Sequence, residues 1–194
     1  MPTIAQRFAN KLKSTMDIEF HPVYLWIGQI AYTTLGSVWV AVSDKGLIAL
    51  QIGTTEEKLL HLVESRYKTR PILDQERVND IARQIKAYLE GNLRKFDIPI
   101  DWSGIPAFQK QVLLTTLNIP YGRTVTYSEI AKRLGRPKAA RAVGRAEATN
   151  PMPLVIPCHR VIGADGSLRG YGAPGGVHTK AKLLRLERGE RNLF

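Results

Sequence analysis

Apolar positions in the first half of the chain recur with a period of two and then of about 3.6, which predicts strands followed by helices. The strand-like runs are Leu25–Thr33, Val38–Ser43 and Leu47–Ile52. Asp44–Gly46 has the composition of a hairpin turn, so we expect an antiparallel meander. Two amphipathic helices are predicted next, at about 55–67 and 78–90. The half is most simply an α+β scaffold.

The second half has a mostly helical pattern. One helix is predicted from Pro106 to Pro120, where the second proline ends it. Thr126 and Glu129 have the spacing of a capping box, so a short helix should follow at 127–134. A further helix is predicted at 137–149, after a turn that contains glycine. Two short helices joined in this way indicate a helix-turn-helix.

Residues 154–162 are apolar on both sides of Cys158, which is the only cysteine in the chain. The run reads as a buried strand. His159 and Arg160 follow the cysteine, and cationic neighbours favour the reactive thiolate. The alternative is an inert thiol that behaves as a small hydrophobic side chain. On a strand, Cys158 and His159 would point apart, so proton transfer between them should pass through a bridging water.

A glycine-rich loop at 168–176, which can shape a pocket wall, and a final helix at about 177–188 complete the pattern. Glu187 lies three and four residues after two leucines, so it shares their inner face. A carboxylate on that face needs a partner, and His159 is the candidate; the alternative is a solvated carboxylate at a fraying helix end.

Charge divides the chain into two parts. Residues 1–101 hold 13 Lys and Arg against 12 Asp and Glu, whereas residues 102–194 hold 15 against 5. We therefore expect two domains, a structural one at 1–101 and one that faces a polyanion at 102–194, with nucleic acid the first candidate. The alternative is a basic surface that only aids solubility.

Composition excludes several classes of protein. One cysteine rules out an intramolecular disulfide framework and a cysteine-rich zinc site. No apolar run has the length of a membrane span, so no membrane association is expected. Residues 1–15 are basic and mildly amphipathic; we interpret them as a frayed end rather than a targeting peptide.

The second helix of the predicted helix-turn-helix is rich in alanine. Such a slim helix can approach a narrow minor groove, where a few basic side chains would hold it. The basic residues on or beside it are Arg136, Lys138, Arg141 and Arg145. The alternative is that the alanines are good helix formers packed on a neighbouring helix.

Together these motifs resemble the O6-alkylguanine-DNA alkyltransferases, also called methylated-DNA–protein-cysteine methyltransferases. The resemblance covers about residues 104–189. It is carried by Gly104–Phe108, Ile119–Gly122, Thr126–Tyr127, Ala139–Gly144, Asn150–Pro153 and Ile156–Ile162. Residues 22–100 are compatible with the ribonuclease-H-like domain of that family. The resemblance therefore implies this α+β domain followed by a mostly α, winged helix-turn-helix domain.

The resemblance also implies a reaction and the residues that perform it. Cys158 would take the O6-alkyl group of a flipped guanine irreversibly, so each molecule would act once. His159 would activate the Cys158 thiol through a water molecule, and Glu187 would polarise that histidine. Asn150 would hold the active-site turn, and Tyr127 would hydrogen-bond the flipped guanine and assist its departure. The O4-alkyl group of thymine is a further candidate substrate.

The remaining carried-over roles concern DNA and the pocket. Arg141 would enter the base stack from the minor groove and fill the vacated space. Further DNA contacts are expected from Thr126, Tyr127, Arg136, Lys138 and Arg145. The pocket would be lined by Pro153, Val161, Tyr171 and Gly172. The expected partner is double-stranded DNA that carries O6-alkylguanine, bound by a monomer without cofactor or metal. Cytoplasmic, nucleoid-associated localisation is expected in a prokaryote and nuclear localisation in a eukaryote.

Two departures from the family pattern and two other functions remain open. Glu147 stands where an apolar or amide residue is usual, which puts local packing in doubt. The loop after Tyr171 is two residues longer, at Ala173–Pro174, which leaves the preferred alkyl size open. The other functions are a non-catalytic binder of alkylated DNA, against which Cys158 itself argues, and a helix-turn-helix regulator with a structural thiol.

Overall fold

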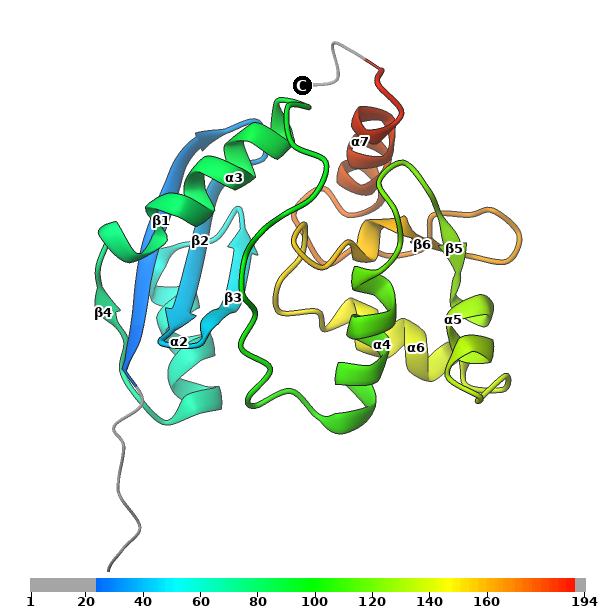
Figure 1. The fold of residues 1–194 in the computed structure, drawn as a ribbon, viewed down its shortest axis with the longest axis horizontal. Helices are drawn as coiled ribbons and strands as arrows, with labels where there is room; N and C mark the ends of the chain where they lie inside the picture. Colours follow the sequence, from blue (N-terminus) through cyan, green and yellow to red (C-terminus); the bar gives the residue numbers. More distant parts are fainter. Residues whose placement is uncertain (1–23, 191–194) are drawn as a thin grey trace, which may run out of the picture.

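The computed structural model describes residues 24–190 and confirms an α+β first half followed by a mostly helical second half (Figure 1). The interpretation of residues 1–15 as a frayed end concerns positions outside this range. Within it, no helix is long and apolar enough to cross a lipid bilayer.

The first half is built on a four-stranded sheet of order β3-β2-β1-β4. Its strands are β1 (Leu25–Thr33), β2 (Gly36–Ser43), β3 (Gly46–Ile52) and β4 (Ile72–Leu73). The three predicted strands pair antiparallel as expected. The prediction lacks β4, which pairs parallel to β1, because two residues are too few to show an apolar period.

Helices cover both faces of this sheet. They are α2 (Glu56–Tyr67) and α3 (Asn79–Leu89), the latter preceded by the 3₁₀ turn η1 (Glu76–Val78). Successive side chains of β2 point to opposite faces. Val40 therefore packs in the cluster that includes the inner face of α3, whereas Trp39 packs in the cluster that includes α2.

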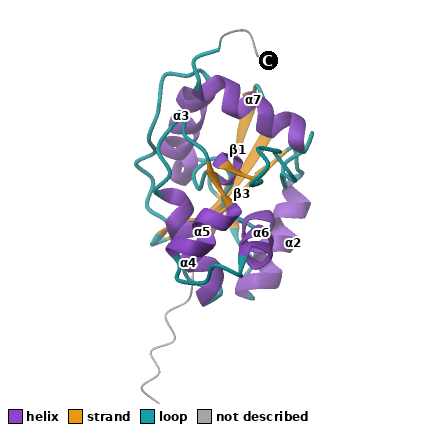
Figure 2. Cartoon of the chain, turned by 90° about the vertical axis from the view of Figure 1, so that its right-hand side faces the viewer, coloured by secondary structure: helices purple, strands orange, loops and turns teal. Residues whose placement is uncertain are grey.

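The second half contains the predicted helix-turn-helix. Its elements are α4 (Ala107–Leu117), β5 (Val125–Thr126), α5 (Tyr127–Arg133), α6 (Ala140–Ala148), the 3₁₀ turn η2 (Cys158–Arg160), β6 (Val161–Ile162) and α7 (Val177–Glu187). The short strands β5 and β6 pair in parallel. Figure 2 shows α5 and α6 at one end of the molecule and α7 at the other.

Helix α6 begins at Ala140 rather than at the predicted Pro137. The intervening residues form a turn in which the Ala139 N–H donates to the Arg136 carbonyl oxygen. Arg136 precedes a proline, which disfavours helical geometry there, so the chain turns before the helix starts. Lys138 consequently lies in this turn and not on the helix.

The predicted strand around Cys158 was wrong. The segment is buried, but only Val161–Ile162 is a strand, and Cys158–Arg160 forms one 3₁₀ turn. Pro157 has no N–H to donate to a neighbouring strand. The Ile156 carbonyl oxygen accepts from the side chain of Asn150 instead. Just before the cysteine the chain therefore forms no continuous strand, and Ile156 makes only an isolated bridge with Pro153.

The largest hydrophobic cluster joins the two halves of the chain. It combines Val40 and Leu50 of the sheet with Leu154 and Leu183 of the second half. The Leu50 N–H also donates to the Pro151 carbonyl oxygen at 2.8 Å. The sheet therefore supports the loop that precedes Cys158. A domain boundary at 101/102 stays a prediction.

Candidate active site

Asn150 holds the turn that leads to the cysteine. Its side-chain amide donates to the Ile156 carbonyl oxygen at 2.9 Å, and its oxygen accepts from the Met152 N–H at 3.0 Å. Leu154, inside this loop, has a φ of 71°, a conformation uncommon for a residue with a side chain. The hydrogen bonds of Asn150 keep the loop in this conformation and thereby place Cys158.

Cys158 is 6% exposed and lies at the wall of a cavity. Burial raises the pKa of its thiol to about 12, and the carboxyl group of Glu147 adds to this shift. The amide of Asn150 and the ammonium of Lys180 act in the opposite direction without overcoming it. The free protein therefore holds a thiol at neutral pH, and its reaction requires a base.

The expectation that neighbouring cations favour the thiolate was wrong. Complete burial lowers the pKa of His159, and the opposing effect of Glu187 offsets this only in part, so the ring is neutral at neutral pH. Arg160 directs its guanidinium to the Glu187 carboxylate and to the Ile119 carbonyl oxygen. Residues adjacent in sequence thus contribute little positive charge at the sulfur.

His159 and Glu187 form a buried pair, as the helical spacing predicted. His159 Nε2 lies 2.8 Å from Glu187 Oε1, and both side chains are fully buried. An ionised carboxylate only accepts hydrogen bonds, so the proton of the neutral ring is assigned to Nε2. Nδ1, which is also buried, has no hydrogen-bond partner among residues 24–190 and is free to accept a proton.

Several further donors surround the Glu187 carboxylate. Arg160 donates from Nε and Nη2, the Gly122 N–H donates at 2.9 Å, and the Tyr88 hydroxyl donates at 2.5 Å. Burial alone would raise the pKa of Glu187, but bonds from His159 and Arg160 hold the pKa far below its usual range. Glu187 is therefore a stable anion behind the histidine.

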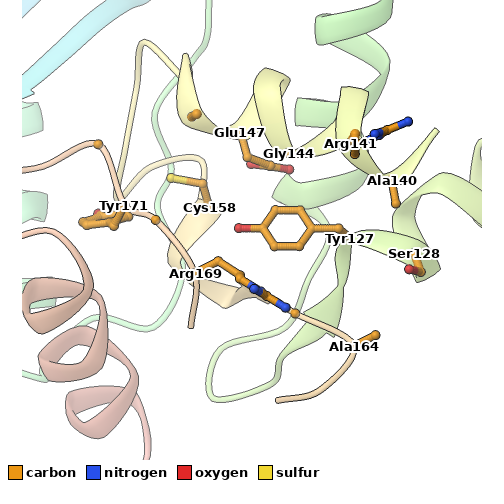
Figure 3. Close-up of a pocket in the computed structure, with 14 residues that line it drawn as sticks. Tyr127, Ser128, Ala140, Arg141, Gly144, Glu147, Cys158, Ala164, Arg169 and Tyr171 are labelled. Atoms are coloured by element: carbon orange, nitrogen blue, oxygen red, sulfur yellow. The ribbon is translucent and has the colours of Figure 1, made fainter. Parts of the chain in front are cut away.

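A cavity of about 630 Å³ opens in front of Cys158, between α6, the start of α5 and the glycine-rich loop (Figure 3). Its lining includes Tyr127, Arg141, Gly144, Glu147, Arg169, Tyr171 and Gly172. Figure 3 shows the Tyr127 ring directed toward the cysteine, whereas Arg141 points away from it. The prediction that the glycine-rich loop forms a pocket wall is confirmed.

The helix-turn-helix presents the predicted basic residues to its surroundings. Thr126 caps α5 in the predicted capping box with Glu129. Arg136, Lys138, Arg141 and Arg145 are exposed. The two interpretations of the alanines both hold in part, because Ala146 is buried against the neighbouring helices whereas Ala142 is exposed.

Two predicted pocket residues take different places. Pro153 borders a second cavity of about 330 Å³, which Cys158 and Tyr171 also line. Val161, in contrast, is fully buried in the core of the helix-turn-helix, because β6 directs it toward Val125 and Ile130. The Val161 side chain therefore packs in the core and does not line the pocket.

Sequence reasoning missed two residues of the site. Tyr88 falls within the amphipathic helix predicted at 78–90, and no local pattern distinguishes it from a core tyrosine. Lys180 is fully buried, and its Nζ donates to the Val161 carbonyl oxygen at 2.6 Å. It lies seven residues before Glu187 on the same face of α7, so the spacing that identified Glu187 also pointed to Lys180.

Glu147 is buried and lines the cavity beside Cys158. One carboxyl oxygen accepts from the Thr116 hydroxyl, and Oε2 has no hydrogen-bond partner among the described residues. Burial raises the pKa of Glu147 to about 7, although Thr116 and Lys180 oppose this. The departure noted in the sequence therefore affects the charge of the site rather than its packing alone.

The longer loop after Tyr171 reaches the first half of the chain. Ala173 is buried in the cluster that joins the two halves. Pro174 packs so closely on Gly53 that a Cβ atom there would lie 2.5 Å from Pro174 Cγ. The extra residues thus hold the pocket wall against the end of β3.

Family models match both halves of the chain. Residues 29–102 match the ribonuclease-like domain of 6-O-methylguanine DNA methyltransferase, and residues 107–189 match its DNA-binding domain. A methylated-DNA–protein-cysteine methyltransferase of Mycobacterium tuberculosis is 50% identical over 105 residues. That match covers 54% of this chain and 62% of the relative, less than two thirds of its length.

Other relatives match over more of their length. The methylated-DNA–protein-cysteine methyltransferase of Methanosarcina barkeri is 39% identical over 164 residues, which cover 84% of this chain and 97% of the relative. The crystal structure of Mycobacterium tuberculosis OGT in complex with DNA superposes with a TM-score of 0.73 at 38% identity, covering 85% of this chain and 94% of that one. The chain therefore belongs to the 6-O-methylguanine DNA methyltransferase family.

Proposed function

We propose that this protein repairs DNA by transferring the alkyl group from O6 of guanine irreversibly to Cys158. The observation that carries the proposal is the position of the cysteine. Its thiol lies between a cavity bounded by the helix-turn-helix and a buried His159–Glu187 pair. A nucleophile, a proton acceptor and a group that orients this acceptor thus lie one behind the other. They adjoin a space that can receive an extruded nucleobase.

The proposed reaction is one in-line displacement. The Cys158 proton passes through a water molecule to Nδ1 of His159 as the sulfur attacks the alkyl carbon. A carbon–sulfur bond forms and the bond from that carbon to O6 breaks, with its electron pair remaining on the guanine. The Tyr127 hydroxyl hydrogen-bonds the guanine and donates its proton to it as the bond to O6 breaks, so the guanine departs as a neutral base. The imidazolium of His159 then releases its proton to solvent, and the tyrosine takes a proton back from solvent. Because the thioether is stable, each molecule reacts once.

The resting thiol and neutral imidazole agree with this order of events. Burial keeps the pKa of Cys158 at about 12, so the sulfur holds its proton until substrate is bound. The lowered pKa of His159 keeps its ring neutral, so Nδ1 can accept that proton. The anionic Glu187 then stabilises the imidazolium that forms.

The proposed DNA complex follows from the exposed face of the second half. Thr126, Arg136, Lys138 and Arg145 contact the backbone, and α6 enters the minor groove. Arg141 occupies the space that the damaged base leaves when it rotates into the cavity. Tyr171 and Gly172 line this cavity. Asn150 and Pro153 border the adjoining cavity.

We further propose that a monomer binds duplex DNA carrying O6-alkylguanine, and that O4-alkylthymine is a second substrate. Extrusion exposes the alkyl group of either base to the same sulfur. Such repair takes place where the DNA is, at the nucleoid in a prokaryotic cytoplasm or in a eukaryotic nucleus.

A comparison of wild type with Cys158→Ala on duplexes with and without labelled O6-methylguanine separates the candidate functions. Repair predicts that wild type takes the label, whereas the variant takes none and still binds DNA. Binding without transfer by wild type would indicate a non-catalytic binder. A strong preference for one DNA sequence would indicate a regulator.

A further inference from the structure

Tyr88 reaches the His159–Glu187 pair from the first half of the chain. It lies in the last turn of α3, and its side chain is fully buried. Its hydroxyl donates to Glu187 Oε1 at 2.5 Å and lies 3.1 Å from His159 Nε2. A phenol has one proton, which here goes to the carboxylate. The oxygen keeps a lone pair, and the His159 Nε2–H is the donor within its reach.

Aromatic packing holds this hydroxyl in place. The ring of Tyr88 lies 5.0 Å from that of Phe96 and 6.1 Å from that of Tyr121, measured between centroids. Both neighbours restrict rotation of the ring, so the hydroxyl has little freedom to leave the pair. Because Phe96 is in the segment between α3 and α4, this part of the site is built largely from the first half.

The Tyr88 hydroxyl also influences which atom holds the proton shared by His159 and Glu187. Each donor on a carboxylate lowers its affinity for a further proton, and Glu187 accepts from Tyr88, Arg160 and the Gly122 N–H. A carboxylate stabilised in this way leaves the shared proton on Nε2. His159 Nδ1 then remains the acceptor for the proton of Cys158.

The other ionisable groups around His159 do not replace this contact. Arg160 donates to the Glu187 carboxylate. The Tyr171 ring lies edge-on to the imidazole, with the two ring centroids 6.5 Å apart. Lys180 influences His159 only at longer range, since its ammonium donates to the Val161 carbonyl oxygen. Burial and the Glu187 charge raise the pKa of Tyr88 well above its usual value, so it stays a neutral phenol.

We infer that Tyr88 is a positioning residue for the transfer reaction, which bonds Glu187 and His159 together and keeps Nδ1 as the base. The inference rests on the proposed transfer to Cys158. It makes the first half of the chain a part of the active site and not only its support.

The test compares Tyr88→Phe, which removes the hydroxyl and keeps the ring, with Tyr67→Phe. The Tyr67 hydroxyl donates to the Ser103 carbonyl oxygen at 3.0 Å, and Tyr67 packs against the cluster on the α2 face of the sheet, whereas Tyr88 belongs to the cluster on the α3 face. Single-turnover transfer from O6-methylguanine duplex is measured from acidic to alkaline pH, because the lowered pKa of His159 places its titration below neutrality. Alkylation of Cys158 by iodoacetamide is measured in parallel, and thermal melting reports stability.

Tyr88→Phe should slow both reactions roughly tenfold, as expected for one hydrogen bond to a charged group. Its pH profile should move to higher pH, because Glu187 with one donor fewer raises the pKa of His159. Tyr67→Phe should keep the wild-type rate and profile. In the wild-type chain, ¹⁵N shifts should show a neutral His159 protonated at Nε2.

A wild-type rate in Tyr88→Phe, or a slower rate with an unchanged pH profile, would overturn the inference, as would an imidazole protonated at Nδ1. Failure of the proposed function has a different signature. The wild-type chain would then remove no methyl group from DNA, while the iodoacetamide reactions would still report whether Tyr88 acts on Cys158 through His159.

Discussion

At the scale of single residues, the environment of Cys158 explains why its thiol needs a base in order to react. The sulfur is buried beside the carboxyl group of Glu147, and both features oppose the thiolate. In the proposed reaction the thiol depends on His159 as its base, and Glu187 and Tyr88 contact the far side of that ring. We propose that this arrangement limits reaction of the thiol until substrate fills the cavity.

Glu147 should make the stability of the protein fall as pH rises. Its pKa is raised from 4.5 to about 7 in the folded chain, so folding favours its protonated form. The associated stability is present below pH 4.5 and is lost as pH rises through about 7. Relative to Glu147→Gln, wild type should lose about 3 kcal/mol at most across this window.

Urea unfolding of both proteins below and above this window measures that difference. Glu57→Gln, at an exposed position of α2, is the matched control and should follow wild type at each pH. If wild type and Glu147→Gln kept a constant difference in unfolding free energy, the buried carboxyl group would not titrate as described.

The sequence patterns identified the site residues that belong to short motifs. Cys158, His159 and the inward spacing of Glu187 are visible in short motifs, and Asn150 ends a predicted helix. Tyr88 is different, because its partners lie 71 and 99 residues further along the chain. An apolar helix face looks the same whether its tyrosine faces a hydrocarbon core or a buried carboxylate.

At the scale of elements, α5 is a helix of seven residues whose start depends on its cap. Thr126 accepts from the Glu129 N–H, and Glu129 accepts from the Thr126 N–H. Thr126→Ala should therefore reduce the free energy of unfolding by about 1 kcal/mol. It should also weaken DNA binding, since Tyr127 and the following turn depend on this helix.

Chemical denaturation and a duplex titration measure the two effects. Thr115→Ala removes a hydroxyl that bonds only within α4, so it is the matched control and should change stability by no more than about 0.5 kcal/mol. Equal losses in both variants would show that the cap does not determine the stability of α5.

The elements that sequence patterns predicted best are those with clear ends. The capping box of α5 and the meander of β1 to β3 have matching turn residues and caps. The segment around Cys158 resembled a strand because a buried irregular loop is as apolar as a buried strand. Pro157 and the side chain of Asn150, acting over six residues, decide its actual conformation.

At the scale of the whole molecule, the separation of charge should govern DNA affinity. Residues 102–194 hold 15 basic and 5 acidic residues, so binding to any duplex should weaken strongly as salt increases. Arg145→Ala should reduce the slope of log affinity against log salt by about one, because one phosphate contact is lost.

Fluorescence anisotropy with duplexes of unrelated sequence measures this slope. Arg83→Ala, which alters an exposed ion pair on α3, should leave the slope unchanged. A salt-independent affinity, or an equal effect of the two substitutions, would place the DNA elsewhere than on the helix-turn-helix.

The division into two parts was visible in charge and pattern, whereas their contact was not. We propose the boundary at 101/102 as the limit of two structural units that share one hydrophobic cluster. Contacts such as those of Tyr88 with Glu187, and of Pro174 with Gly53, cross that boundary. They depend on three-dimensional packing, which has no periodic signature in the sequence.

In the proposed function, Cys158 accepts one alkyl group and the protein then reacts no further. Mass spectrometry of the intact protein and of its Cys158 peptide, after incubation with excess O6-methylguanine duplex, tests it most directly. We expect one methyl group per protein, located on Cys158, one restored guanine per protein, and no further reaction. Repeated turnover, or a methyl group on another residue, would contradict it.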